Sequence, residues 1–299
     1  MTDSVPTVID LLTRTDFLVG GFLGITGLVV LLFAPRTGDL SILDWGLTLT
    51  AGAFLAVGLA LGASLALVGG LGALALGGWM ARPPSGSARA PFGWALIGIG
   101  ALAVVWRGGF PEIGWILVLA PVAIVAIGTT LAAWATRLPQ EPLGIMIAIT
   151  AFGIWVTVPE TEGARALLGA SIPMALATLR PVGAKLGYAG AFALAGLLVW
   201  VVANGGEART ASIIGGWACV GALAILPHYQ PPPTRLVGSR RTITVLVHGL
   251  LVLVSSRIIG LWESGGLALV AVMVLGVGVY LALRLLPLAK TGRASLTEE

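Results

Sequence analysis

Arg257 is the charged residue that lies deepest in an apolar segment of this 299-residue chain. It lies five residues before the end of segment 242–262, about 7.5 Å inside that boundary at helical rise. Ionisable side chains within a bilayer are costly and by default indicate function. Near a segment end, however, a guanidinium can reach the interface or pair with an acid on a neighbouring helix. We favour this structural interpretation for Arg257.

His248 lies in the same segment, but nine residues turn a helix by about 900°, so His248 and Arg257 point to opposite faces. Ser255 shares the face of His248 but lies about 10.5 Å along the helix, too far for a hydrogen bond. A Ser–His nucleophile would need a serine from elsewhere, such as Ser64 or Ser171, each of which follows Gly-Ala. Gly-Ala-Ser is common in such a chain, and we identify no catalytic residue.

Charged residues also gather around the start of segment 164–179, where Glu160, Glu162 and Arg165 lie in the short polar stretch 159–165. Acids at the start of a helix are stabilised by the positive end of its dipole, which is a sufficient structural account. The functional alternative is a mouth that attracts cations.

Two prolines interrupt apolar segments: Pro121 in 113–135 and Pro173 in 164–179, beside Ser171. A proline inside a helix frees a backbone carbonyl and tends to kink the helix. Kinked helices line the binding sites of many transporters, although prolines are also routine in membrane helices. We expect a substrate cavity, if there is one, near these two helices.

Cofactor and metal motifs are missing from the sequence. There is no His-Glu-x-x-His, no Walker glycine loop and no aspartate-rich phosphate motif. Two histidines, His228 and His248, and one cysteine, Cys219, cannot supply a histidine or thiolate metal cluster. We therefore expect no cofactor, no metal and no enzyme activity. The net charge of +4 is scattered along the chain, so we also expect no nucleic-acid partner.

The elements that hold these residues are apolar along nearly the whole chain. Apolar residues make up 57% and charged residues 10% of the sequence, against about 25% charged residues in ordinary soluble domains. The mean hydropathy is +1.00. A hydrated surface cannot be built from the remainder, so we expect the lipid bilayer to surround most of the chain.

The apolar segments predict an all-α, polytopic membrane bundle. They cover residues 17–33, 45–61, 65–81, 92–106, 113–135, 143–158, 164–179, 187–203, 212–227, 242–262 and 266–286. Residues 45–81 would measure about 54 Å as one helix, against a hydrocarbon core of about 30 Å. Two helices with a turn at 62–64 fit better and give eleven transmembrane helices. Ten is the alternative, if part of this stretch lies along the interface.

The predicted organisation is a polar segment at 1–16, one transmembrane domain at 17–286 and a tail at 287–299. Acidic residues precede the first apolar segment and no cleavage site follows it, so we expect it to be retained. With eleven helices, 12 of the 16 lysines and arginines other than Arg257 lie on the side of the C-terminus. Such an excess marks the cytoplasmic face. We expect a bacterial plasma membrane, a cytoplasmic C-terminus and an N-terminus outside.

Pairs of apolar segments joined by short polar loops recur along the chain. They are either a true internal repeat or the alternation of apolar segments and short loops that any polytopic protein shows. Residues 17–62 (FLVGGFLGITGLVVLLFAPRTGDLSILDWGLTLTAGAFLAVGLALG) and 93–128 place glycine-rich helices around a proline-containing loop. This pattern resembles the repeated hairpin of HdeD-like acid-resistance membrane proteins. The resemblance covers about a third of the chain, and the second half departs from it. It implies a role in membrane stress and assigns no site residue.

Three functions are compatible with this sequence. A small-solute transporter or channel explains the helix number, the paired segments and the proline-containing helices. A non-catalytic subunit or scaffold of a larger membrane complex explains why no acid lies well inside any segment. An enzyme that acts on lipid is the third, and the scarcity of catalytic side chains argues against it. We favour the transporter, whose partners are the bilayer and possible further membrane subunits or copies of itself.

Overall fold

The computed structural model describes residues 11–33, 44–61, 64–82, 89–106, 114–137, 141–158, 162–178, 185–203, 210–225, 245 and 248–254. Within these ranges the regular secondary structure is entirely helical, which confirms the all-α class there. The helices are α2 (Thr15–Phe33), α3 (Trp45–Leu61), α4 (Leu65–Met80), α5 (Arg89–Trp106), α6 (Gly114–Arg137), α7 (Glu141–Thr157), α8 (Glu162–Ala177), α9 (Tyr188–Ala203) and α10 (Thr210–Ile225).

Each of these helices lies within three residues of a predicted apolar segment at both ends. The stretch from Trp45 to Ala81 forms two helices, as expected. The second helix begins after Ser64, whose hydroxyl oxygen accepts a hydrogen bond from the backbone N–H of Leu67 at 3.3 Å. This capping interaction satisfies one of the backbone donors that a helix start leaves without a partner. Segment 266–286 and most of segment 242–262 lie outside the described residues.

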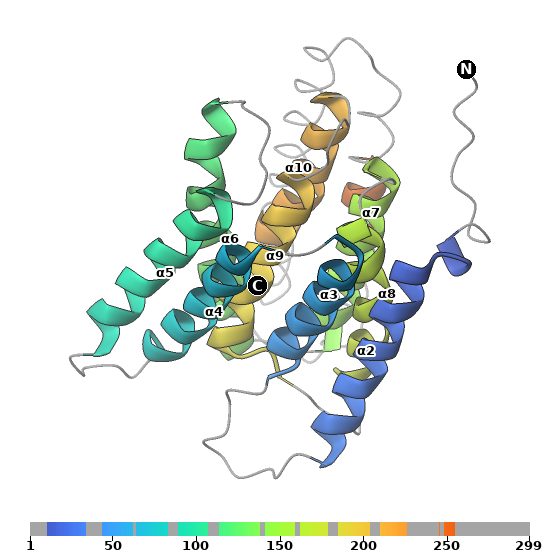
Figure 1. Ribbon diagram of the computed structural model, residues 1–299, viewed down its shortest axis with the longest axis horizontal. Coiled ribbons are helices and arrows are strands. Elements are labelled where there is room, and N and C mark those ends of the chain that lie inside the picture. The colour runs from blue at the N-terminus through green and yellow to red at the C-terminus, as the bar shows by residue number, and fades with distance from the viewer. Residues whose placement is uncertain are drawn as a thin grey trace, which may run out of the picture.

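Helix α9 lies at the centre of the bundle and packs against α6, α4 and α3 (Figure 1). Every residue from Ala189 to Ala203 is buried. Helix α8 is also largely buried and packs against α2, α7 and α3. The core is therefore built around α9, which is apolar on all sides as expected for a helix surrounded by other helices, and the largely buried α8.

Glycines bring the backbones of two helix pairs into contact. A Cβ atom at Gly24 of α2 would lie 2.8 Å from the carbonyl oxygen of Ala170 in α8, and Gly20 meets Ala166 one turn earlier. Residue numbers rise together along this contact, so α2 and α8 run parallel. In α4 and α5, Gly77 meets Gly93 while Gly70 meets Gly100, so this pair is antiparallel. Such close approach through small residues is common in membrane helix pairs.

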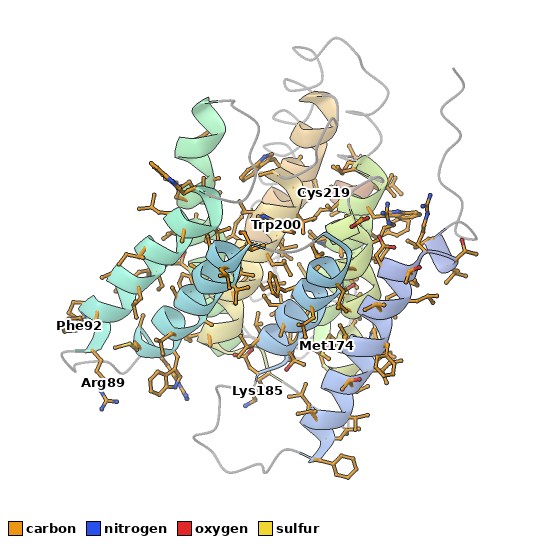
Figure 2. The ribbon with its side chains drawn as sticks, viewed as in Figure 1. Arg89, Phe92, Met174, Lys185, Trp200 and Cys219 are labelled. Atoms are coloured by element: carbon orange, nitrogen blue, oxygen red, sulfur yellow. The ribbon has the colours of Figure 1, made fainter. Side chains whose placement is uncertain are left out.

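The two ends of the bundle can be named from these contacts. End A is where α2 and α8 begin, and end B is where α3 and α9 begin. Gly163, at the start of α8, lies against Val201, near the end of α9, which places these two helix starts at opposite ends. Arg89 and Lys185 both lie at end B, at the bottom of the view in Figure 2.

The outer faces carry large apolar side chains. Phe22 and Phe33 of α2, together with Phe92, Ile99 and Trp106 of α5, are exposed, with Trp106 82% exposed. Among the described helices, α2 and α5 are long and apolar enough to cross a membrane, and 28% and 33% of their most apolar stretches are buried. The core helix of a soluble protein would be mostly buried. This exposed apolar surface suggests that the chain associates with a membrane.

Candidate functional site

The described residues place three groups of buried polar side chains in the apolar bundle. The first is an ion pair at end A, where Nε of Arg165 in α8 donates to Oδ2 of Asp16 in α2. Both side chains are about nine-tenths buried. Asp16 also accepts a hydrogen bond from the backbone N–H of Phe17 at 3.0 Å through its other oxygen. The parallel contact between α2 and α8 holds the two charges together.

Glu162 lies one helical turn before Arg165, in the first turn of α8. Its Oε2 atom is buried and has no hydrogen-bond partner. Around the starts of α2 and α8, the described charged residues are thus Arg14, Asp16, Glu162 and Arg165, two acidic and two basic. The sequence pointed to Glu162 and Arg165 but not to Asp16, which belonged to the predicted polar segment 1–16. The position of Asp16 directly before the apolar segment 17–33 was the feature of the sequence that could have indicated a charged group at the end of a helix.

The second group lies at end B around Asp44, the residue before α3. Its Oδ1 accepts from the backbone N–H of Leu47 at 2.8 Å, and its Oδ2 accepts from that of Gly190 at 3.1 Å. One carboxylate thus caps two helices, α3 and α9. Burial raises the pKa of Asp44 to about 6, and hydrogen bonds from backbone N–H groups partly oppose this shift. The sequence reasoning did not select this residue.

The third group is inside the bundle, where His248 meets α7. Nε2 of His248 lies 2.9 Å from the hydroxyl oxygen of Thr150 and 3.1 Å from the carbonyl oxygen of Met146. The Thr150 hydroxyl is also 2.9 Å from that carbonyl oxygen. His248 and Thr150 are both fully buried, and no described residue is a hydrogen-bond partner of Nδ1 of His248.

One arrangement of the hydrogen atoms around Nε2 satisfies all three distances. A carbonyl oxygen can only accept, so Nε2 carries the proton and donates toward Met146 and Thr150, while the Thr150 hydroxyl donates to Met146. Nε2 is then unable to take a proton from Thr150. The pair therefore lacks the arrangement in which a histidine activates a hydroxyl nucleophile. The sequence analysis did not select Thr150, although a threonine in the middle of apolar segment 143–158 indicates a buried polar group.

The two prolines lie on separate interfaces. Pro173 is buried in α8 and faces α2, where its Cγ atom would lie 3.2 Å from a Cβ atom at Gly24. Pro121 is half-buried in α6, which packs mainly against α9 and α5. Helices α6 and α8 are not packing neighbours, so the described residues do not bring the two prolines together.

The remaining candidates have local structural partners or fall outside the described residues. Ser171 is buried and donates to the carbonyl oxygen of Leu168 at 2.8 Å. Cys219 is a buried free thiol whose sulfur lies 3.9 Å from the carbonyl oxygen of Val252. Arg257 and Glu160 lie outside the described residues. In the part of the chain that the structure describes, no three His, Cys, Asp or Glu side chains gather as a metal site would require.

Comparison with known proteins does not assign the chain to a family. No family model matches the chain, and no curated protein matches it. The resemblance to HdeD-like proteins therefore stays a prediction from the sequence, and the case for a function depends on the buried polar groups.

Proposed function

We propose that this chain is a polytopic membrane protein that carries a small solute across the bilayer, as a transporter or channel. The observation that supports this best is the presence of Asp16, Arg165 and His248 inside a bundle whose outer face is apolar. Burying ionisable groups in such surroundings costs free energy. A bundle with a purely structural role could avoid this cost with apolar residues.

The proposed membrane domain spans residues 17–286 with about eleven helices. The described helices contain 16 to 24 residues and so measure about 24 to 36 Å, close to a hydrocarbon thickness of about 30 Å. We place end B in the cytoplasm, because Arg89 and Lys185 lie there and basic residues favour the cytoplasmic face. In this orientation the Asp16–Arg165 pair lies near the outer face, in a bacterial plasma membrane.

Helix α8 supports transport rather than scaffolding. This largely buried helix carries Glu162, Arg165, Ser171 and Pro173. It packs against α2 and also against α7, the helix whose Thr150 contacts His248. A proline-containing helix at the centre of a bundle, with charges at one end, is typical of helices beside transport pathways. At the mouth, the carboxylate of Glu162, which lies beside the Asp16–Arg165 pair, would be the group that meets cations or protonated solutes.

A second candidate is a non-catalytic subunit of a membrane complex. The exposed face of α5 supports it, since Phe92, Trp94, Ile99 and Trp106 are all exposed there. Large aromatic side chains are enriched in protein interfaces, although Trp is also enriched at membrane interfaces. In this case the protein would bind a partner helix and move no solute alone.

Reconstitution of the purified protein alone in liposomes distinguishes the two. Uptake of inorganic ions, amino acids and sugars would be screened against protein-free vesicles. A substitution at the end-A ion pair, Arg165→Gln, would test the site, and Gly69→Ala, on an open face of α4, is the matched control. We expect saturable uptake that Arg165→Gln reduces and Gly69→Ala does not. Flux that appears only with a co-purified partner would support the subunit instead.

A further inference from the structure

The Nδ1 atom of His248 is a hydrogen-bond acceptor that has no partner among the residues that the structure describes. The imidazole is 0% exposed, and its other nitrogen is engaged by Thr150 and Met146. With the proton on Nε2, Nδ1 presents a bare lone pair to the interior. A buried polar atom without a partner costs free energy, so such an atom calls for an explanation.

The site lies near the middle of the proposed bilayer. Thr150 is nine residues after the start of α7 and seven before its end, which places it about 13 Å and 10 Å from the two ends. Binding sites of alternating-access transporters lie at this depth, where both faces of the membrane are equally distant.

No charged group faces the imidazole from the described parts of the neighbouring helices. Residues 143–157 of α7 contain no titratable side chain, and in residues 215–223 of α10 the only one is Cys219. Its thiol lies against the carbonyl oxygen of Val252, one turn beyond His248. In the part of the chain that the structure describes, His248 is therefore the group that can gain a charge at this depth.

Close packing around the site favours a proton over a larger ligand. A Cβ atom at Gly153 would lie 3.0 Å from the sulfur of Cys219 and closer still to Val252. A Cβ atom at Gly249 would be in ordinary van der Waals contact with Ile149, at 3.9 Å. A solute would need these helices to separate, whereas a proton needs only a lone pair and a path for its transfer.

We infer that His248 is an internal proton-binding site, at which Nδ1 takes up a proton from water on one side and returns it to the other. The uptake forms one N–H bond and converts the neutral imidazole into an imidazolium; release reverses this, so no other reactant is consumed. The inference rests on the proposed transport function for its role: the solute would move together with H⁺. Thr150 is a positioning residue that holds Nε2.

The protonation state can be measured without a substrate. The chain has two histidines, so His228→Gln leaves His248 as the only ¹⁵N-histidine signal of the full-length protein in lipid nanodiscs. We expect the Nε2–H tautomer at neutral pH and reversible protonation of Nδ1 on acidification, with the helix content unchanged by circular dichroism. An Nδ1–H tautomer at neutral pH, or protonation only as the helices unfold, would overturn the inference.

A transport assay then tests coupling. In liposomes with an imposed pH gradient, His248→Gln retains a polar side chain that cannot be protonated and should lose the stimulation of uptake by the gradient. His228→Gln is the matched control and should retain it. If His248→Gln still responds to the gradient, proton coupling at His248 fails while the transporter proposal stands. If no variant moves solute but His248 titrates in the folded protein, the transport proposal fails and the proton-binding site stands.

Discussion

The contact between α4 and α5 depends on Gly70 and Gly77, two glycines on one face of α4. A Cβ atom at Gly70 would lie 2.8 Å from Cγ2 of Val104, 2.9 Å from its backbone nitrogen and 3.1 Å from the carbonyl oxygen of Gly100. A Cβ atom at the adjacent Gly69 would meet nothing within 4 Å. Gly70→Ala and Gly69→Ala therefore make the same chemical change on one helix, once inside and once outside the contact.

The expected effects have opposite signs. Replacing a glycine in a helix by alanine stabilises by about 0.5–1 kcal/mol, because the unfolded chain loses less freedom on folding. Gly69→Ala should show this gain. In Gly70→Ala the gain is opposed by overpacking, which costs about 1–3 kcal/mol when backbone atoms must shift. We expect Gly70→Ala to be less stable than Gly69→Ala by about 1–3 kcal/mol.

Unfolding of the detergent-solubilised protein by a denaturing detergent, followed by far-ultraviolet circular dichroism, measures this difference. A second pair on α2 repeats the test, since a Cβ atom at Gly20 would clash with the backbone of Ala166, whereas one at Gly21 would lie 3.7 Å from the carbonyl oxygen of Gly169. If the members of each pair agree within about 0.5 kcal/mol, the range of neutral substitutions, backbone contact does not hold these helices together.

Three further predictions follow from the charged groups and the orientation. Arg165→Gln leaves the buried Asp16 without its partner and should lower the free energy of unfolding by about 3–5 kcal/mol. Adding Asp16→Asn should recover part of that loss, and purely additive losses would contradict the coupling. The pKa of Asp44 is raised from 3.8 to about 6, so the folded state binds its proton more tightly than the unfolded state does. The resulting stability, about 3 kcal/mol, is fully present below about pH 4 and is lost as the pH rises through 6. Asp44→Asn should flatten the pH dependence of unfolding in this window, and an unchanged profile would refute the assignment. In a Cys219→Ala background, Leu236→Cys should react with a membrane-impermeant thiol reagent only after cells are permeabilised. Labelling of intact cells would reverse the proposed orientation.

The helices themselves could be predicted from the sequence because each is a long apolar run bounded by polar, glycine or proline residues. The ends of α3 and α4 follow directly from this pattern, including the interruption at Ser64. Such signals are local, since a backbone that leaves water must satisfy its own hydrogen bonds as a helix. The all-α class and the apolar exterior follow from composition in the same way.

The partners of the polar groups were decided by tertiary structure. Arg165 and Asp16, which form the ion pair, are 149 residues apart in the sequence. The hydrogen-bonded residues Gly190 and Asp44 are 146 residues apart, and His248 and Thr150 are 98 residues apart. No local pattern specifies such pairs, because each depends on which two helices become neighbours and on the rotation of each about its axis. Glycine positions set that choice by allowing α2 to approach α8 and α4 to approach α5. The sequence determined where the helices lie along the chain, and close backbone packing decided which buried charges and hydrogen-bonding groups meet.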